Sequence, residues 1–437
     1  MANTRVLSQA KILRPYRNPN VWTFLGTSRV IAQYNDGTTQ FNLSNTGWMN
    51  WANSALRAQG KPIINTFNYG VSGNRTDQFL TNLAAMVASG AGSVLLDGPI
   101  NDIAQLYPTA GTSAATSLAN LKTIIKAAND AGMRVFYVWE RGANNYTAQQ
   151  IGILADFNRL MVDYLNYGDD FRGPPMVVTL DQSPFAVTTS GNGAIALKNS
   201  GDGTHDNIVG AQVIGAGLAP IIAPYLNPMP GHRQTSLNQS VSSAANSAYN
   251  MMISPGFSGT SGAAGGTGNS GNVPAGWTAS QNSLATAAFS IVAGSADANG
   301  NTWGNDVSVA VTATGAGTVI LFQALTITNV VAGDIIRAGI EYDVAAGATG
   351  LNGVQVYLQP FNTQGTPSTT DGSVNANAIA GNDAGGYSNY IAEPPALKLP
   401  ANQTGLTAIR LRADIVMRGA GSCTVKFRKP WAERATA

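Results

Sequence analysis

The sequence holds few residues of several kinds that carry chemistry in other proteins. It has one cysteine, Cys423, and two histidines in 437 residues, and only 11% of its residues are charged. A single cysteine excludes an intrachain disulfide and a cysteine metal cluster. The formal net charge of +2 gives no electrostatic reason to expect nucleic acid or an anionic membrane as a partner.

Long apolar runs are also missing. No uninterrupted run approaches the ~20 residues that cross a bilayer, and the opening residues, MANTRVLSQAKILRPYRNPN, lack the apolar core of a secretory signal. We therefore expect a soluble protein that ordinary secretion does not export. No P-loop, dinucleotide fingerprint, HExxH motif or paired-cysteine site occurs, so the sequence implies no cofactor and no metal.

Two halves with different patterns make up the chain, and its length favours two domains. Residues 1–228 are expected to form the first domain, in which short apolar runs alternate with segments of helical period. The expected strands are 21–25, 62–67, 93–96, 134–139 and 176–180. Five alternations of strand and helix predict an α/β domain with three layers (α/β/α) around a five-stranded parallel sheet.

The helices between these strands are indicated by their apolar period. Residues 117–132 place five apolar side chains on one face, and Gly132 ends that helix. A second helix begins after Thr147, which is expected to be its N-cap. A last helix is expected from 208 to 226, with a break near Pro220. The residues expected to be buried in the first two helices are Leu118, Leu121, Ile124, Ile125 and Ala128, and Ile151, Leu154, Phe157, Met161 and Leu165.

The second half is rich in glycine, serine, threonine and asparagine. Residues 229–272 are polar or Gly/Ser-rich and are expected to form a linker, in which His232 is solvated. Residues 273–437 contain runs of period two, separated by glycine, asparagine and proline, without helical segments. In 406–416, for example, apolar residues alternate with Arg410, Arg412 and Asp414. This pattern predicts an all-β sandwich or jelly roll of about eight strands.

Polar residues follow the expected strands of the first half at the points where each strand ends. Ser28 follows the first strand, a glycine turn with Gly73 the second, Asn101 the third, and the segment containing Asp202 and His205 the fifth. In open parallel sheets the ligand site lies beyond the carboxyl ends of the strands. Each residue alone has an ordinary explanation as a turn, cap or loop residue. Together they are the parts that ester hydrolysis needs: a hydroxyl nucleophile, a base with an orienting carboxylate, and oxyanion donors.

This ordered set resembles the four sequence blocks of the SGNH (GDSL-type) hydrolase superfamily, over about residues 21–226. FLGTS resembles the nucleophile block, NYGVSGNRT the glycine block, GPIND the asparagine block and DGTH the DxxH block. The resemblance implies a flavodoxin-like SGNH fold. It also implies that the catalytic residues are Ser28, Asp202 and His205, and that the oxyanion hole is formed by Ser28, Gly73 and Asn101. Two departures stand out: Thr27 replaces the family's usual aspartate, and GPIND is one residue longer than the family's block.

Four further residues lie in or after strand-end loops and are candidates for substrate binding: Arg75, Trp139, Glu140 and Arg141. An exposed loop rim is the alternative explanation for each of them. Trp48 and Trp51 are more simply explained as core and rim aromatics of a helix.

The second half also resembles a known type of domain, although less specifically. The stretches NMMISPGFSG and NVPAGWTAS resemble the start of carbohydrate-binding jelly-roll modules. The alternative, which we favour, is that Phe257 and Trp277 are core residues of the sandwich. The candidates for contact with sugar are Trp303, Tyr357, Tyr387 and Tyr390.

Taken together, these resemblances predict a serine esterase that removes acyl groups, above all O-acetyl groups, from a polysaccharide. The composition of the second half also resembles bacteriophage tail-fibre and tailspike enzymes, which implies a virion-associated protein released by lysis and assembled as part of the virion or as a homo-oligomer. Two alternatives stay open: a general short-chain acyl or lipid esterase, and a non-catalytic glycan-binding virion structural protein. A bacterial cytoplasmic location is the alternative to the virion.

Overall fold

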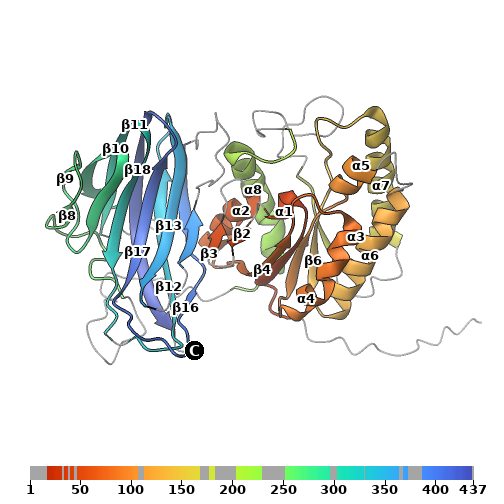
Figure 1. Cartoon of the computed structure of the whole chain (residues 1–437), viewed down its shortest axis with the longest axis horizontal. Coiled ribbons are helices and arrows are strands. Elements are labelled where there is room, and N and C mark those ends of the chain that lie inside the picture. The colour runs from red at the N-terminus through yellow and green to blue at the C-terminus, as the bar shows by residue number, and fades with distance from the viewer. Residues whose placement is uncertain are drawn as a thin grey trace, which may run out of the picture.

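The computed structural model shows an α/β domain beside a β-domain (Figure 1). The residues that it describes are 17–31, 34–37, 40–43, 47–106, 113–167, 177–182, 203–228, 251–295, 302, 304–328, 330–363, 368–372 and 386–435. Asp202, His232 and Trp303, which were singled out in the sequence, lie outside these ranges.

A five-stranded sheet forms the centre of the α/β domain. Its strands are β1 (Val21–Gly26), β4 (Ile64–Gly70), β5 (Ser93–Leu96), β6 (Arg134–Val138) and β7 (Val177–Leu180). They lie in the order β4-β1-β5-β6-β7, and every neighbouring pair is parallel. The predicted parallel sheet is confirmed, with strand ends that differ from the expected ones by a few residues.

Helices cover both faces of this sheet (Figure 1). They are α1 (Ser28–Ile31), α2 (Trp48–Ala58), α3 (Thr76–Phe79), α4 (Leu83–Ala88), α5 (Ile100–Leu106), α6 (Ala114–Asp130), α7 (Ala148–Tyr167) and α8 (Ile208–Ile222), with 3-10 turns at Leu80–Asn82 and Ala223–Tyr225. Helices α2 and α8 share one buried cluster with Trp22 and Phe24 of β1. Helices α3, α4, α6 and α7 share the cluster on the opposite face with Leu25 and Val94. The predicted three-layer arrangement is therefore confirmed.

The helix ends follow the signals in the sequence. The Ser113 side chain caps α6 by accepting a hydrogen bond from the Thr116 N–H. Thr147 and Gln150 cap α7 reciprocally, because the Thr147 N–H donates to the Gln150 side chain at 2.8 Å and the Thr147 hydroxyl accepts from the Gln150 N–H. The five predicted core positions of α6 are buried. Helix α8 ends two residues after Pro220, close to the predicted break.

Helix α8 and the turn after it are unusually apolar. The segment Ile208–Tyr225 has a mean hydropathy of 1.6 over 18 residues, so by length and composition it could cross a membrane. Half of the segment is buried inside the protein, where α8 packs against α2. A core helix of a globular domain has this composition as well.

The β-domain is organised around a long hairpin of β10 (Thr278–Ala293) and β11 (Asn305–Ala324). The first half of β11 pairs with β18 and its second half with β17, so the sheet divides into two layers. The other strands are β8 (Ala263–Ala264), β9 (Ser270–Gly271), β12 (Ile335–Val344), β13 (Leu351–Phe361), β14 (Thr369–Gly372), β15 (Tyr387–Ala392), β16 (Leu397–Lys398), β17 (Ala408–Met417) and β18 (Gly421–Ala435).

The apolar residues of period two line the space between the two layers. Ile409 and Leu411 of β17 are buried, whereas Arg410 and Arg412 lie on the outer face. Phe257 and Trp277 are also buried, with ring centroids 4.9 Å apart. The prediction that these two rings belong to the core is confirmed.

The boundary expected between the two domains is wrong in one respect. Strands β2 (Tyr34–Gly37) and β3 (Gln40–Leu43) form a hairpin, and β3 pairs with β14 of the β-domain. Residues of the first half thus complete the sheet of the second. Within the described residues this sheet has 13 strands, of which β2 and β3 come from the first half, so the second half holds more than the eight strands expected. The hairpin follows α1 directly, so the β-domain is joined to the segment that carries Ser28.

The expected linker is wrong for residues 251–272. Met251, Met252 and Phe257 are buried in the core of the β-domain, and β8 and β9 pair with β10. Backbone hydrogen bonding to an exposed strand edge needs no apolar side chains, which is why a Gly/Ser-rich composition did not prevent ordered packing. The remaining residues of that linker, 229–250, lie outside the described ranges.

An aromatic and polar interface joins the two domains. The ring of Trp51 on α2 meets Tyr387 and Tyr390 of β15 edge to face, at 4.9 and 5.1 Å. The Tyr390 hydroxyl donates to the Asn50 side chain at 2.7 Å, and the Ser54 hydroxyl accepts from the Ile391 N–H at 2.8 Å. Because both tyrosines are buried here, the expectation that they contact sugar is wrong.

Candidate active site

Ser28 and His205 meet at the carboxyl edge of the parallel sheet. The Ser28 hydroxyl oxygen lies 2.7 Å from Nε2 of His205, which is hydrogen-bonding distance. Ser28 is the first residue of α1, immediately after β1, and His205 lies in the loop that leads into α8. A hydroxyl held against an imidazole in this way is the arrangement by which a base activates a serine nucleophile.

The turn that presents Ser28 is held by a carboxylate from the neighbouring strand. Asp97, directly after β5, accepts hydrogen bonds from the Thr27 N–H at 3.1 and 3.2 Å and from the Thr27 hydroxyl. A Cβ on Gly26 would lie 2.2 Å from the Asp97 carboxylate oxygen, so a larger residue at the end of β1 would displace the carboxylate that holds Thr27. Asp97 thus ties the end of β5 to the turn that carries Ser28.

Asp97 is buried, and its protonation differs from that of an ordinary aspartate. Burial above all, together with the nearby Glu140 carboxylate, raises the pKa of Asp97 to about 7. The hydrogen bonds from Thr27 and the charge of Arg29 lower this pKa and so oppose part of the shift.

The loop that carries His205 is shaped by Gly203. This residue has φ +76°, and a Cβ there would lie 2.0 Å from the Asn144 amide nitrogen. The Asn144 N–H donates to the Gly203 carbonyl at 3.2 Å, which ties this loop to the one after β6. The Asn207 side chain then caps α8 by accepting from the Gly210 N–H. The glycine of DGTH is therefore a packing requirement as well as a turn residue.

Two of the predicted oxyanion residues, Gly73 in the loop after β4 and Asn101 at the start of α5, lie in segments that are tied together. The Gly73 carbonyl accepts from the Gln105 side chain at 2.6 Å, and Gly73 has φ +81°. The Asn101 amide nitrogen donates to the Asn74 carbonyl at 2.8 Å. The neighbouring Asp102 accepts from the Thr76 N–H at 2.9 Å and fixes the start of α3.

The glycine loop also reaches the end of the strand that leads to Ser28, because the Val71 N–H donates to the Gly26 carbonyl at 3.0 Å. The glycine and asparagine loops thus lie at the same edge of the sheet as Ser28, as the strand-end rule predicts.

Two of the four residues proposed for substrate contact are buried in ion pairs. Glu140 pairs with Arg29 at 2.6 Å, and Arg141 pairs with Asp206 at 2.8 Å. The explanation of an exposed rim is wrong for Glu140 and Arg141, which are 4% and 8% exposed. Burial lowers the pKa of Arg141 to about 10, although the Asp206 carboxylate opposes that shift.

The other two candidates lie nearer the surface. Arg75 is partly exposed and pairs with Asp77 at 3.0 Å. Trp139 is half-buried, and its ring meets Tyr137 edge to face at 5.6 Å. Both positions are compatible with a role at the rim of a substrate site.

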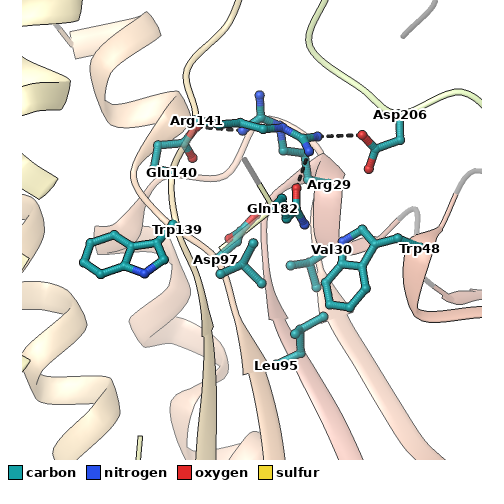
Figure 2. A pocket seen from close by; sticks show the side chains of 11 residues that line it. Arg29, Val30, Trp48, Leu95, Asp97, Trp139, Glu140, Arg141, Gln182 and Asp206 are labelled. Carbon is teal, nitrogen blue, oxygen red and sulfur yellow. Dashed lines mark hydrogen bonds and ion pairs between the residues drawn. The ribbon is translucent and has the colours of Figure 1, made fainter. Parts of the chain in front are cut away.

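A pocket lies between these buried charges, at the ends of β5, β6 and β7 (Figure 2). Arg29, Asp97, Arg141, Gln182 and Asp206 point into it. Its interior of about 20 Å³ admits little more than one water molecule. It is therefore too small to be the substrate site.

Four residues of this cluster were not singled out in the sequence: Arg29, Asp97, Gln182 and Asp206. One signal could have indicated them, because charged residues are scarce in this chain, yet several flank the strand ends and the predicted catalytic residues. Within the described ranges, no three or more histidine, cysteine or acidic side chains converge in a way that could hold a metal ion.

Comparison with known proteins gives similarity to parts of the chain only. No family model matches the sequence, and no curated protein matches it. Among solved structures, a G-D-S-L family lipolytic protein of Desulfitobacterium hafniense is 13% identical, with a TM-score of 0.35 over 46% of this chain and 99% of that protein. An acetyl xylan esterase is 14% identical, with a TM-score of 0.36 over 45% of this chain and 97% of its own.

The β-domain has a match as well. A carbohydrate-binding module of the β-sandwich superfamily is 16% identical, with a TM-score of 0.25 over 36% of this chain and 56% of that protein. Similarities this low leave the chemistry to be inferred from the residues of the site itself.

Proposed function

We propose that the protein is a serine esterase that removes acyl groups, above all O-acetyl groups, from a polysaccharide. The observation that carries this proposal is the 2.7 Å contact between the Ser28 hydroxyl and His205 Nε2 at the carboxyl edge of the sheet. A buried shell of hydrogen bonds holds both residues, as a preorganised catalytic pair requires.

In the proposed reaction His205 takes the hydroxyl proton as Ser28 Oγ attacks the carbonyl carbon of the ester. The tetrahedral intermediate collapses when the C–O bond to the sugar breaks, and His205 returns the proton to the departing sugar hydroxyl. Water then attacks the acyl-enzyme with His205 again as the base, which releases the carboxylic acid and regenerates Ser28. Asp202, which lies outside the described residues, is proposed to orient His205.

The oxyanion is proposed to be stabilised by the backbone N–H groups of Ser28 and Gly73 and by the side chain of Asn101. An amide nitrogen carries two hydrogens. The hydrogen bond from Asn101 to the Asn74 carbonyl therefore orients the amide and leaves a second N–H for the substrate.

A polysaccharide substrate is favoured by the outer face of β11, β17 and β13. The guanidinium of Arg410 lies between the rings of Phe322 and Phe361, 4.4 and 4.2 Å from their centroids. Beside it, Arg412 lies over the Tyr357 ring at 5.2 Å. Tyr357 is one of the aromatics named for sugar contact. We propose that the face holds the polymer near the esterase site.

Two other functions are less well supported. A general short-chain acyl or lipid esterase would use the same serine and histidine, but it would not need the outer face of the β-domain. A non-catalytic virion structural protein would have no need of the Ser28–His205 contact. Association with a bacteriophage tail, as part of the virion assembly or as a homo-oligomer, is part of our proposal and is supported by the composition of the second half alone.

The direct test is release of acetate from purified acetylated polysaccharides by the full chain and by its Ser28→Ala variant. We expect release by the wild type and loss of release in the variant, with an unchanged circular dichroism spectrum. Acetate release that survives Ser28→Ala would overturn the assignment of the nucleophile. Hydrolysis of aryl acetates without release from any acetylated polysaccharide would favour the general esterase.

A further inference from the structure

The two residues that flank His205 are each held by an arginine. Nε of Arg29 donates to the Thr204 carbonyl at 2.9 Å, on one side of the histidine. On the other side, a terminal nitrogen of Arg141 donates to the Asp206 carboxylate at 2.8 Å. The histidine loop is thus held on both sides of the proposed base, through a backbone carbonyl at Thr204 and through the side chain of Asp206.

Each arginine is anchored at its far side as well. The two terminal nitrogens of Arg29 reach Glu140, at 2.6 Å, and the Gly142 carbonyl. Glu140 itself accepts a hydrogen bond from the Gly142 N–H at 2.8 Å. The two residues of the loop after β6 that bind the Arg29 guanidinium are therefore also bonded to each other.

The second terminal nitrogen of Arg141 donates to the side chain of Gln182, two residues after β7. Figure 2 shows the pairs that Arg141 and Arg29 form with Gln182, Asp206 and Glu140 around one pocket. The histidine loop is therefore connected to the ends of two strands of the rigid sheet.

Stability alone is a poor explanation for this cluster. The side chains of Arg29 and Glu140 are 12% and 1% exposed, and those of Arg141 and Asp206 are 7% and 5% exposed. The free energy that it costs to remove such charges from water can equal or exceed the attraction between them. Proteins in which apolar side chains of similar size replace a buried ion pair are often as stable as the original. A planar guanidinium instead contributes geometric specificity. Its N–H donors point in fixed directions, so they determine where the oxygens that they bind must lie.

We propose that Arg29 and Arg141 are positioning residues that set His205 Nε2 against Ser28 Oγ, and that neither touches the ester. Arg29 has the larger role because it directly follows Ser28 in the chain. One side chain therefore couples the helix that carries the nucleophile to the loop that carries the base. This inference rests on the proposed esterase function.

The test compares Arg29→Met, Arg29→Lys and Arg141→Met with wild type on a soluble aryl acetate. Arg159→Met is the matched control, because the Arg159 side chain is 62% exposed on α7. A small displacement of reacting groups costs on the order of 10²-fold in rate, so we expect kcat to fall by tenfold to 10²-fold in both methionine variants. KM should change little, because the arginines do not contact substrate. Arg29→Lys should recover part of the rate, since lysine keeps the charge but not the fork.

A second measurement separates positioning from folding. The rate at which a fluorophosphonate labels Ser28 should fall in parallel with kcat, while thermal unfolding shows one cooperative transition in every variant. If Arg29→Met does not fold, Arg29→Lys carries the test. Wild-type kcat and labelling in the folded Arg29 and Arg141 variants would overturn the inference. A wild-type protein that neither hydrolyses esters nor reacts with the probe would instead overturn the proposed function itself.

Discussion

Arg57 on helix α2 and Asp371 on strand β14 form an ion pair that is buried between the two domains, 314 residues apart in the chain. Arg57 also donates to the carbonyls of Ile391 and Glu393, at 3.1 and 3.0 Å. This ion pair and the aromatic contacts of Trp51 show that the β-domain packs against helix α2. The β-domain is therefore a structural partner of the α/β domain as well as a proposed glycan-binding module.

The first prediction follows from that interface. A chain that ends at Asn227 keeps every proposed catalytic residue. It loses the tyrosines that pack on Trp51, the Asp371 partner of Arg57 and strand β14, which pairs with β3. We expect this shortened protein to be aggregated or unfolded, as measured by gel filtration and circular dichroism.

A milder form of the same test is Arg57→Met in the full chain. Removing one partner of a buried ion pair costs about 3–5 kcal/mol, and urea unfolding should report a loss of that order. A control is Arg57→Met combined with Asp371→Leu, which removes both charges of the buried pair and should recover part of the loss. Glu393, which also pairs with Arg57 at 3.6 Å, keeps its charge in this variant, so the recovery should not be complete. A shortened chain that is monomeric, folded and active would contradict the structural role of the β-domain.

The second prediction concerns the proposed base and its orienting carboxylate. His205→Ala should reduce kcat on an aryl acetate nearly as much as Ser28→Ala, because proton transfer depends on the imidazole. Asp202→Asn should cost less, since the carboxylate acts through the histidine. Steady-state rates of the three variants measure this order. A larger loss in Asp202→Asn than in His205→Ala would mean that the roles are assigned wrongly.

Much of this site follows from the sequence, since apolar runs and helical periods fix the strands and the strand-end rule then selects Ser28 and His205. The parts that could not be predicted depend on contacts between distant segments. Strands β2 and β3, YNDG and QFNL, are too short and polar to show an alternation. Nothing local to Arg57 indicates a partner 314 residues away. The hydrogen bonds of Arg29 to the loops after β6 and before α8 likewise cannot be predicted from the periodicity of the sequence.

The third prediction concerns the oxyanion hole. Asn101→Ala should lower kcat by on the order of 10²–10³ if its second N–H stabilises the oxyanion. The control is Gln105→Ala, which removes the neighbouring hydrogen bond to the Gly73 carbonyl without removing an oxyanion donor, and which should cost much less. Equal and small losses in both variants would mean that Asn101 only ties the two loops together.

The fourth prediction is a dependence of stability on pH. The pKa of Asp97 is raised from 3.8 to about 7 in the folded protein, chiefly by burial. The folded state therefore holds this proton more tightly than the unfolded state does. The resulting stabilisation is fully present below about pH 3.8 and is lost as the pH rises through about 7. Each pKa unit corresponds to about 1.4 kcal/mol, so the contribution of Asp97 amounts to a few kcal/mol.

Urea unfolding between pH 5 and pH 8 measures this effect in wild type and in Asp97→Asn, which cannot titrate. Burial also raises the pKa of Glu433 to about 7, so this residue contributes a change of the same sign to both proteins. The share of Asp97 is the difference between the two pH profiles. Parallel profiles would show that Asp97 is ionised in the folded state across this range.

The fifth prediction concerns the outer face of the β-domain. Within the described residues Arg410 has no ion pair, whereas the neighbouring Arg412 binds Asp414 through two contacts of 2.6 Å. A guanidinium that is held between two rings and lacks a carboxylate partner can bind an anionic group without further ordering. Arg410→Gln should therefore weaken binding to an acidic acetylated polysaccharide, measured by affinity electrophoresis, and raise KM on that polymer. It should leave kcat on an aryl acetate unchanged, because the face is separate from Ser28.

Arg159→Gln is the matched control for loss of one positive charge. Equal binding by wild type and Arg410→Gln would show that this face does not take part in substrate recognition. Equally weak binding by Arg410→Gln and Arg159→Gln would show that only the net charge of the protein matters.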